Sequence, residues 1–147
     1  MLKIFLLIPI LFANATWDTF NFHTNLTCTV RDVASYSIQF IELDGWPNPN
    51  DDVTKVFSME MTNGKSQQEF TGGLDGDASS EYVIRVHITH NCTTDGAEKS
   101  SQTKLLKKFD TDTNHDVYLQ IHLANLEGTV AVTKLYSSNA GLTEIIG

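Results

Sequence analysis

Long apolar runs are almost absent from this sequence. The one at residues 4–12 is too short to span a bilayer. Lys3 precedes it and Ala13-Asn14-Ala15 follows it, and a positive residue, an apolar run and small residues in this order are typical of a secretory signal peptide. We therefore predict a signal peptide over residues 1–15 and a soluble, secreted, extracellular mature chain over residues 16–147. The alternative is a buried hydrophobic segment at the N-terminus.

Positive charge is also scarce. The chain has 10 Lys and Arg residues against 18 Asp and Glu residues, which gives a formal net charge of −8 at pH 7. Removal of Lys3 with the signal peptide would make the mature chain one charge more negative. An acidic surface disfavours nucleic acid and anionic membranes, so we expect neither as an electrostatic partner. Residues 16–147 are the size of one domain with a single core.

Cysteine occurs only at Cys28 and Cys92. In an oxidising compartment two cysteines most simply pair with each other, which predicts a Cys28–Cys92 disulfide. Because the bond would close a long loop, the chain-entropy model gives it a stabilisation of about 4 kcal/mol. The alternative is a pair of buried free thiols.

Two N-glycosylation sequons, at Asn25 and Asn91, lie within the predicted mature chain. A glycan requires its asparagine to face solvent. Of the two, we favour Asn25, because an early disulfide at Cys92 would block access to the neighbouring Asn91.

Helical periodicity is nearly absent, and alternation takes its place. In residues 81–90 and 117–123 every second residue is apolar, which is typical of half-buried strands. Further strands are predicted at residues 26–30 and 37–43. In the second of these the apolar residues change phase, which indicates a β-bulge or a strand buried on both faces.

Turn residues separate these strands. Two prolines exclude a central strand in residues 44–52. Asn63-Gly64 predicts a two-residue hairpin between residues 57–61 and 67–70. Loops are also predicted around Gly72-Gly73, at residues 75–77, and at residues 95–102, where one short helical turn is the alternative. Seven to eight short strands without a repeat or linker indicate an all-β, immunoglobulin-like sandwich.

Five segments of the chain occur together in a recognisable order. They are Leu26-Thr27-Cys28; residues 41–44 with 47–52; residues 64–70 with Gly72; residues 82–84 with His90-Asn91-Cys92; and Phe109, Val117 and residues 121–126. In this order, from about Asn25 to Leu126, they resemble the nematode transthyretin-like family. The departures are a stretched hairpin, no glycine directly after the first cysteine, and a tail past Gly128. The resemblance implies a secreted transthyretin-type sandwich with a Cys28–Cys92 bridge and an extracellular binding role.

Relatives of transthyretin that hydrolyse 5-hydroxyisourate supply the alternative function. They resemble one another in an N-terminal histidine, a central arginine and a Tyr-Arg-Gly-Ser ending. Here Tyr136-Ser137-Ser138 lacks the arginine, and the spacing of His23 and Arg31 marks no site. We therefore expect no enzymatic activity and no cofactor.

Metal ligands are not arranged in a recognisable pattern. His87 and His90 are three residues apart and point to opposite faces of a strand. Residues 110–114 begin like an EF-hand loop, but His115 stands where glycine is needed and Ile121 where a bidentate glutamate belongs. We predict an acidic turn there and no metal site.

Loops at the ends of the sandwich form the predicted contact surface, because rigid sheets present them to partners. The candidate residues in residues 44–52 are Trp46, Asp51 and Asp52, and residues 75–80 form a second candidate loop. Trp46 is interpreted as either an exposed anchor or a lid over the core. Lys104, Lys107 and Lys108 are interpreted as protection of an edge strand, with an anionic lipid headgroup or sulfated glycan as the alternative.

The leading hypothesis is a secreted binding, bridging or carrier module. Its ligand would be a hydrophobic small molecule, a lipid or a cell-surface protein, bound without a metal. A purely structural extracellular component is the third possibility.

Overall fold

A computed structural model describes residues 17–45, 49–75, 80–123, 130–137 and 142–143 of the chain. These residues form nine strands and no helix, so none of them belongs to a helix long and apolar enough to cross a membrane. The strands are β1 (Trp17–Cys28), β2 (Ala34–Glu42), β3 (Phe57–Met61), β4 (Lys65–Asp75), β5 (Glu81–His90), β6 (Lys99–Asp110), β7 (His115–Leu123), β8 (Val130–Ser137) and the two-residue β9 (Leu142–Thr143).

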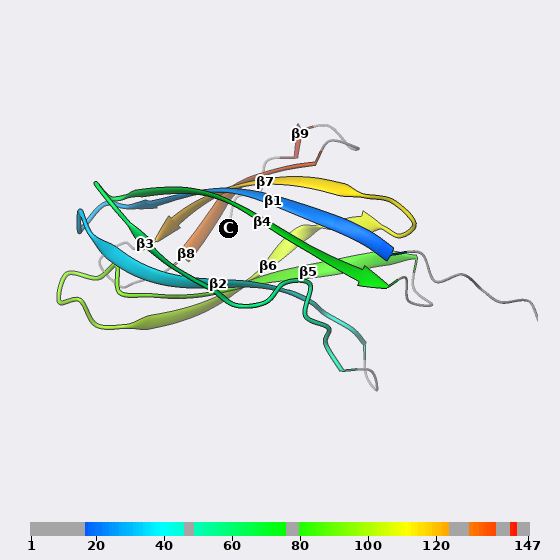
Figure 1. Cartoon of the computed structure of the whole chain (residues 1–147), viewed down its shortest axis with the longest axis horizontal. Helices are drawn as coiled ribbons and strands as arrows, with labels where there is room; N and C mark the ends of the chain where they lie inside the picture. The colour runs from blue at the N-terminus through cyan, green and yellow to red at the C-terminus, as the bar shows by residue number, and fades with distance from the viewer. Residues whose placement is uncertain (1–16, 46–48, 76–79, 124–129, 138–141, 144–147) are drawn as a thin grey trace, which may run out of the picture.

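The strands form two sheets that lie one above the other (Figure 1). One sheet has the order β4-β1-β7-β8-β9 and the other the order β3-β2-β5-β6. The pair β1 and β7 is parallel, whereas the other pairs are antiparallel. The predicted all-β sandwich is thus confirmed. Its strand order differs from that of an immunoglobulin domain, whose first two strands share a sheet, because β1 and β2 lie in different sheets here.

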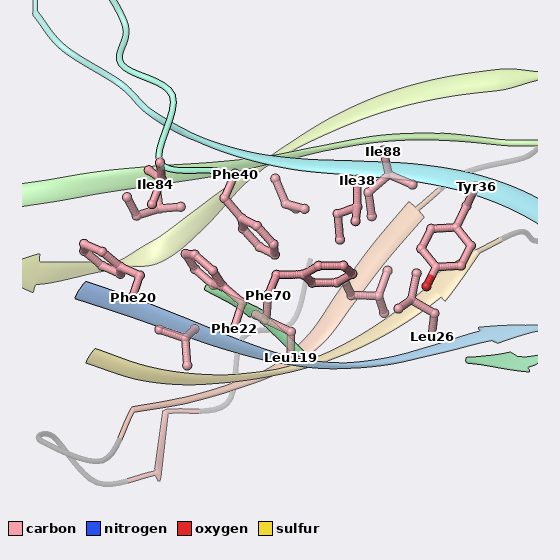
Figure 2. Packing of buried hydrophobic residues seen from close by; sticks show 14 of the residues in the cluster. Phe20, Phe22, Leu26, Tyr36, Ile38, Phe40, Phe70, Ile84, Ile88 and Leu119 are labelled. Atoms are coloured by element: carbon pink, nitrogen blue, oxygen red, sulfur yellow. The ribbon is translucent and has the colours of Figure 1, made fainter. Parts of the chain in front are cut away.

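The core lies between the two sheets and consists mainly of alternate residues of β1, β2, β5 and β7 (Figure 2). Phe22 of β1 and Phe40 of β2 meet across the sandwich with ring centroids 3.7 Å apart and an interplanar angle of 2°. In β5 the predicted inward face is confirmed, since Tyr82, Ile84 and the two following alternate apolar residues are buried. The same holds for the alternate residues of β7 from Val117 to Leu123.

The predicted disulfide is present and joins the two sheets. Cys28 is the last residue of β1, and Cys92 lies two residues after the end of β5. Their Cα atoms are 5.9 Å apart, and both residues are buried. The alternative of two buried free thiols is therefore wrong.

In β2 the change of phase in the apolar pattern has a different cause from either predicted alternative, a β-bulge or a strand buried on both faces. Alternate residues from Ala34 through Phe40 to Glu42 are buried, and the pairing with β5 is regular. The inward position at the end of the strand belongs to Glu42, which is only 2% exposed, while Ile41 lies on the outer, partly exposed face. A buried carboxylate, and not a bulge, therefore shifts the apolar residues out of register.

Asn63 and Gly64 form the predicted turn, with positive φ angles of 54° and 65°. The predicted hairpin is wrong in its pairing, because β3 pairs with β2 and β4 pairs with β1. Beyond the single bridge between Thr62 and Lys65, the two strands diverge into different sheets. A turn signal specifies the local backbone, but the partner of each strand is set by distant residues.

Three further boundaries differ from the sequence prediction. β1 starts at Trp17, nine residues before the predicted strand at residues 26–30. Gly72 and Gly73 lie inside β4 and not in a loop. β6 begins at Lys99, within the stretch predicted as a loop, and forms an edge of its sheet, which is the position predicted for the lysines. Residues 76–79 of the second predicted contact loop lie outside the described residues.

The loop between β5 and β6 is held by its own polar groups. Gly96 has a positive φ of 75°, and the Asp95 carboxylate accepts a hydrogen bond from the Ala97 backbone N–H at 3.0 Å. That hydrogen bond, with a smaller contribution from the Thr93 hydroxyl, lowers the pKa of Asp95. The described part of this loop contains turns and no helix.

Candidate surface groove at the end of the sandwich

The segment that follows the proline-containing loop closes one end of the sandwich. Val53 and Thr54 donate backbone hydrogen bonds to the Phe40 carbonyl at 3.0 and 3.2 Å, and the Thr54 hydroxyl accepts one from the Phe40 N–H at 3.1 Å. On its other side, the Val53 carbonyl accepts a hydrogen bond from the Gly73 N–H at 3.0 Å. Residues 53–54 thus connect β2 of one sheet to β4 of the other.

Glycine at positions 72 and 73 allows this close approach. A Cβ atom on Gly72 would collide with the carbonyl oxygen of Val53, and one on Gly73 would collide with the indole ring of Trp17. Because these two residues have no side chain, residues 53–54 pack against the β4 backbone at Gly72, and the Trp17 ring packs against it at Gly73. This explains why two glycines interrupt the side-chain pattern inside a strand.

We expect Gly72→Ala to lower the free energy of unfolding by about 1–3 kcal/mol, because the added methyl group must displace backbone and not a flexible side chain. Chemical denaturation followed by circular dichroism measures the change. Gly45→Ala is the matched control, since nothing lies within 4 Å of a Cβ atom there. Equal stability of the two variants would show that the segment connecting β2 and β4 can shift at little cost in free energy.

These elements enclose a surface groove of about 670 Å³, which we call the end groove. Its lining residues are Trp17, Thr19, Asp52, Val53, Thr54, Lys55, Phe57, Thr71, Gly72 and Gly73. It lies where β1 begins, β4 ends and the chain leaves β2, at the right-hand end of the view in Figure 1.

Aromatic side chains and opposite charges meet in the end groove. Trp17 is 66% exposed although the backbone beneath it is fixed by pairing with Asp75. The Lys55 ammonium group lies 5.1 Å from the centre of the Phe57 ring, a cation–π contact. Asp52 adds a negative charge to the rim. The groove therefore combines exposed and partly exposed aromatic side chains with charged groups at its edge.

Of the predicted loop residues that the structure describes, Asp51 and Asp52, only Asp52 lines the end groove. Trp46 lies outside the described residues, so the choice between anchor and lid stays open. Asp51 points to a different place, where carboxylate oxygens of Glu42, Asp44 and Asp51 lie within 4.8 Å of one another. In the described ranges these three side chains form the group that could hold a metal ion. Glu42 is buried, whereas Asp44 and Asp51 lie nearer the surface, where acidic groups often lie close together without one. Sequence reasoning missed Trp17, and its only local signal was a tryptophan beside a predicted cleavage point.

The histidines considered as metal ligands or catalytic groups lie apart. His87 contacts the Ser100 hydroxyl on the outer face of its sheet, whereas His90 is buried and its Nδ1 accepts a hydrogen bond from the Cys92 N–H at 3.1 Å. His23 lies in the middle of β1, while Arg31 reaches the Asn91 carbonyl beside the disulfide. The predicted acidic turn follows β6, and its Asp112 N–H donates to buried Asp18.

A second hollow, of about 470 Å³, lies on the outer face of the sheet that contains β1. We call it the outer-face hollow, and it is lined by His23, Thr24, Asn25, Gln67, Gln68, Glu69, Tyr118, Leu119 and Gln120. The sequon asparagine Asn25 is exposed in it, whereas the second sequon asparagine, Asn91, is partly buried and accepts a hydrogen bond from the Ser35 N–H at 2.8 Å.

Comparison with known proteins gives one match. Residues 23–132, well over half of the chain, match a family described as Caenorhabditis elegans protein of unknown function (DUF870). The matched segment contains Asn25, both cysteines and Asp52, and Trp17 precedes it. No curated protein and no solved structure matches the chain significantly.

Proposed function

The chain belongs to the family of Caenorhabditis elegans proteins of unknown function DUF870, and we propose that it is a secreted, disulfide-braced module that binds an extracellular protein through the end groove. The observation that carries this proposal is Trp17. An indole that is two-thirds exposed on a hydrogen-bonded strand is costly to hydrate, and tryptophan is enriched among the residues that dominate binding energy.

A protein ligand fits the groove better than the hydrophobic small molecule or lipid of the initial hypothesis. A carrier encloses its cargo in an apolar cavity. In the described part of the molecule, the space between the sheets is filled by large side chains such as Phe20, Phe22 and Tyr82, each fully buried. The end groove lies outside this core and has charged groups at its edge, as the rim of a protein interface has.

Secretion and the transthyretin-like relationship belong to the same proposal. The signal-peptide pattern of residues 1–15 supports secretion, and so does the disulfide, because such bonds persist in oxidising compartments. The transthyretin-like resemblance is supported by a two-sheet sandwich and by a bridge between the two cysteines that it implied. We propose no hydrolase activity, because the histidine and arginine considered for it lie in different parts of the fold.

We expect Trp17→Ala to weaken partner binding by about 30-fold or more, the loss typical of a central anchor. The mature, oxidised protein, immobilised, is used to capture partners from extracellular and membrane fractions, and the affinity of the captured protein is then measured for each variant. The melting temperature should change by no more than about 2 °C, since surface substitutions have small effects on stability.

Val33→Ala is the matched control for this experiment. Val33 is also an exposed apolar residue, at 56%, but it lies in the turn between β1 and β2 at the opposite end of the sandwich. It should bind like the wild type. Equal binding by the Trp17→Ala variant, or a partner lost equally by both variants, would remove the end groove as the binding site.

A further inference from the structure

The outer face of the sheet β4-β1-β7 is polar along its length. Register brings its residues into rows, with Asn25 of β1 between Gln67 of β4 and Gln120 of β7. In the next row His23 lies between Glu69 and Tyr118. Amide and aromatic side chains therefore surround Asn25 on both sides and along its own strand.

Asn25 differs from His23 and Thr27, its neighbours on the same face of β1, in having no local partner. Its side chain is exposed and makes no hydrogen bond or ion pair within the described residues. By contrast, other rows of this face are linked internally: in the next row the Thr27 hydroxyl lies 2.6 Å from Nδ1 of His122, and two rows away Asn21 donates to Asp116 at 3.2 Å. The amide nitrogen of Asn25 is thus available to solvent in the middle of an ordered surface.

Two stacked rings form a platform beside Asn25. The rings of His23 and Tyr118 have centroids 4.3 Å apart and an interplanar angle of 9°. The His23 ring is fixed by a contact of its Nδ1 with the Glu69 carboxylate and by Asp116, 3.5 Å from Nε2. Tyr118 is 45% exposed, a large fraction for an aromatic ring in the middle of a sheet. Because His23 precedes Asn25 by two residues, the platform and the asparagine share one face.

We propose that Asn25 carries an N-linked glycan and that its first N-acetylglucosamine occupies the outer-face hollow. The C–H face of the sugar packs on the exposed part of the Tyr118 ring, and its hydroxyl and acetamide groups face the side-chain amides of Gln67 and Gln120. A hollow of about 470 Å³ is within the range of small-ligand sites. This inference rests on the proposed secretion, but not on binding at the end groove.

The modification itself is a glycosyl transfer from a lipid diphosphate-linked oligosaccharide. A bond forms between Nδ2 of Asn25 and C1 of the first sugar, the bond from C1 to the diphosphate oxygen breaks, and the amide nitrogen loses one proton. The lipid diphosphate leaves with the bonding electron pair. Asn91 is the poorer acceptor in the folded chain, because its Oδ1 is bound to the Ser35 N–H and Thr93 of its sequon is buried with its hydroxyl bonded to the Ala97 carbonyl.

The first test is occupancy. The full chain is expressed in insect cells, and the secreted protein is analysed by intact mass and glycopeptide mapping for the wild type, Asn25→Gln and Asn91→Gln. We expect the glycan mass to be lost in Asn25→Gln and kept in Asn91→Gln. A secreted protein without a glycan at Asn25 overturns this inference alone. A chain retained in the cells without any glycan overturns the secretion as well.

The second test is whether the first sugar is held by the hollow. Trimming the glycan to a single N-acetylglucosamine should leave the melting temperature unchanged, whereas Asn25→Gln should lower it by about 3 °C, the effect of one aromatic contact in a domain of this size. Asn25→Gln is used in place of complete enzymatic deglycosylation, because the enzyme would convert Asn25 to an aspartate beside Glu69.

The Tyr118→Ala variant tests whether the first sugar packs on the Tyr118 ring. In this background the glycosylated protein and its Asn25→Gln form should melt at the same temperature. His87→Ala is the control, because His87 lies on the outer face of the other sheet, and it should preserve the difference. A difference of about 3 °C that persists in Tyr118→Ala, or none in the wild type, would overturn the inference. These measurements need no binding partner, so a failure at the end groove cannot produce either result.

Discussion

Replacement of Phe22 by alanine is expected to lower the free energy of unfolding by about 4 kcal/mol, within the range for a fully buried phenylalanine. The Phe22 ring is completely buried and stacks on Phe40 of the opposite sheet. Its removal therefore leaves a cavity between the sheets that neither sheet can fill alone. Guanidinium chloride denaturation, followed by circular dichroism, measures the loss.

The free energy contributed by the contact between the two rings can be measured separately from that of burying them. Phe40→Ala and the double variant complete a double-mutant cycle, in which the coupling energy should be about 0.5–1.5 kcal/mol. Val33→Ala, at an exposed position, should change stability by less than about 0.5 kcal/mol. A loss below about 2 kcal/mol for Phe22→Ala would mean that the sheets close over the cavity, and that the stacked pair contributes little to sheet packing.

The second large effect is expected from the disulfide. In the Cys28→Ala, Cys92→Ala double variant, the free energy of unfolding should fall by about 4 kcal/mol, because the unfolded chain gains the entropy of an open loop. The bond joins residues 64 positions apart, and no other cysteine can replace it. The corresponding fall in melting temperature is about 12 °C or more for a domain of this size.

Reduction offers an independent measurement of the same bond. Both half-cystines are buried, so a mild reductant should act slowly on the folded protein and quickly after partial denaturation. The reduced wild-type protein should then match the double alanine variant in stability. If the oxidised and reduced proteins unfold at the same denaturant concentration, the bridge does not restrict the unfolded chain in the way the chain-entropy model assumes.

The parts of the fold that were predictable from the sequence are those whose pattern is local. Strands β5 and β7 have an unbroken alternation of β-branched and other apolar residues, so both their extent and their inward face follow from the sequence. The turn at Asn63-Gly64 likewise needs only two residues that accept a positive φ. The disulfide followed from the number of cysteines and the predicted compartment.

Residues 17–25 of β1 were not predicted as a strand, because the inward face of this stretch contains the polar residues Asp18 and Thr24. Asp18 is buried, and its carboxylate accepts hydrogen bonds from the Tyr82 hydroxyl at 2.6 Å and the Asp112 N–H at 2.8 Å. Both donors are far away in the sequence, so nothing near Asp18 indicates that it is buried. Glu42 at the end of β2 had the same effect on the prediction there. In each case a buried acid interrupts an apolar pattern, and only the tertiary structure shows its surroundings.

The end groove could not be predicted from the sequence for a related reason. Trp17 and Gly73 are neighbours only because β1 pairs with β4, and Val53 reaches Gly72 only because the chain after β2 crosses to the other sheet. Sequence reasoning placed its candidate contact surface at the loop that contributes Asp52 to the end groove, but it could not bring the tryptophan of another strand to that loop.

The parallel pairing of β1 with β7 has a consequence for the order in which the protein matures. β1 is the earliest strand of the described residues and lies in the interior of its sheet, yet its partner residues in β7 are synthesised 95 residues later. Until then one long side of β1 has open backbone donors and acceptors, which is a hazard for misassembly. Cys92 emerges before β7 is complete, so oxidation at that stage would hold β1 beside the nascent opposite sheet while its last neighbour arrives.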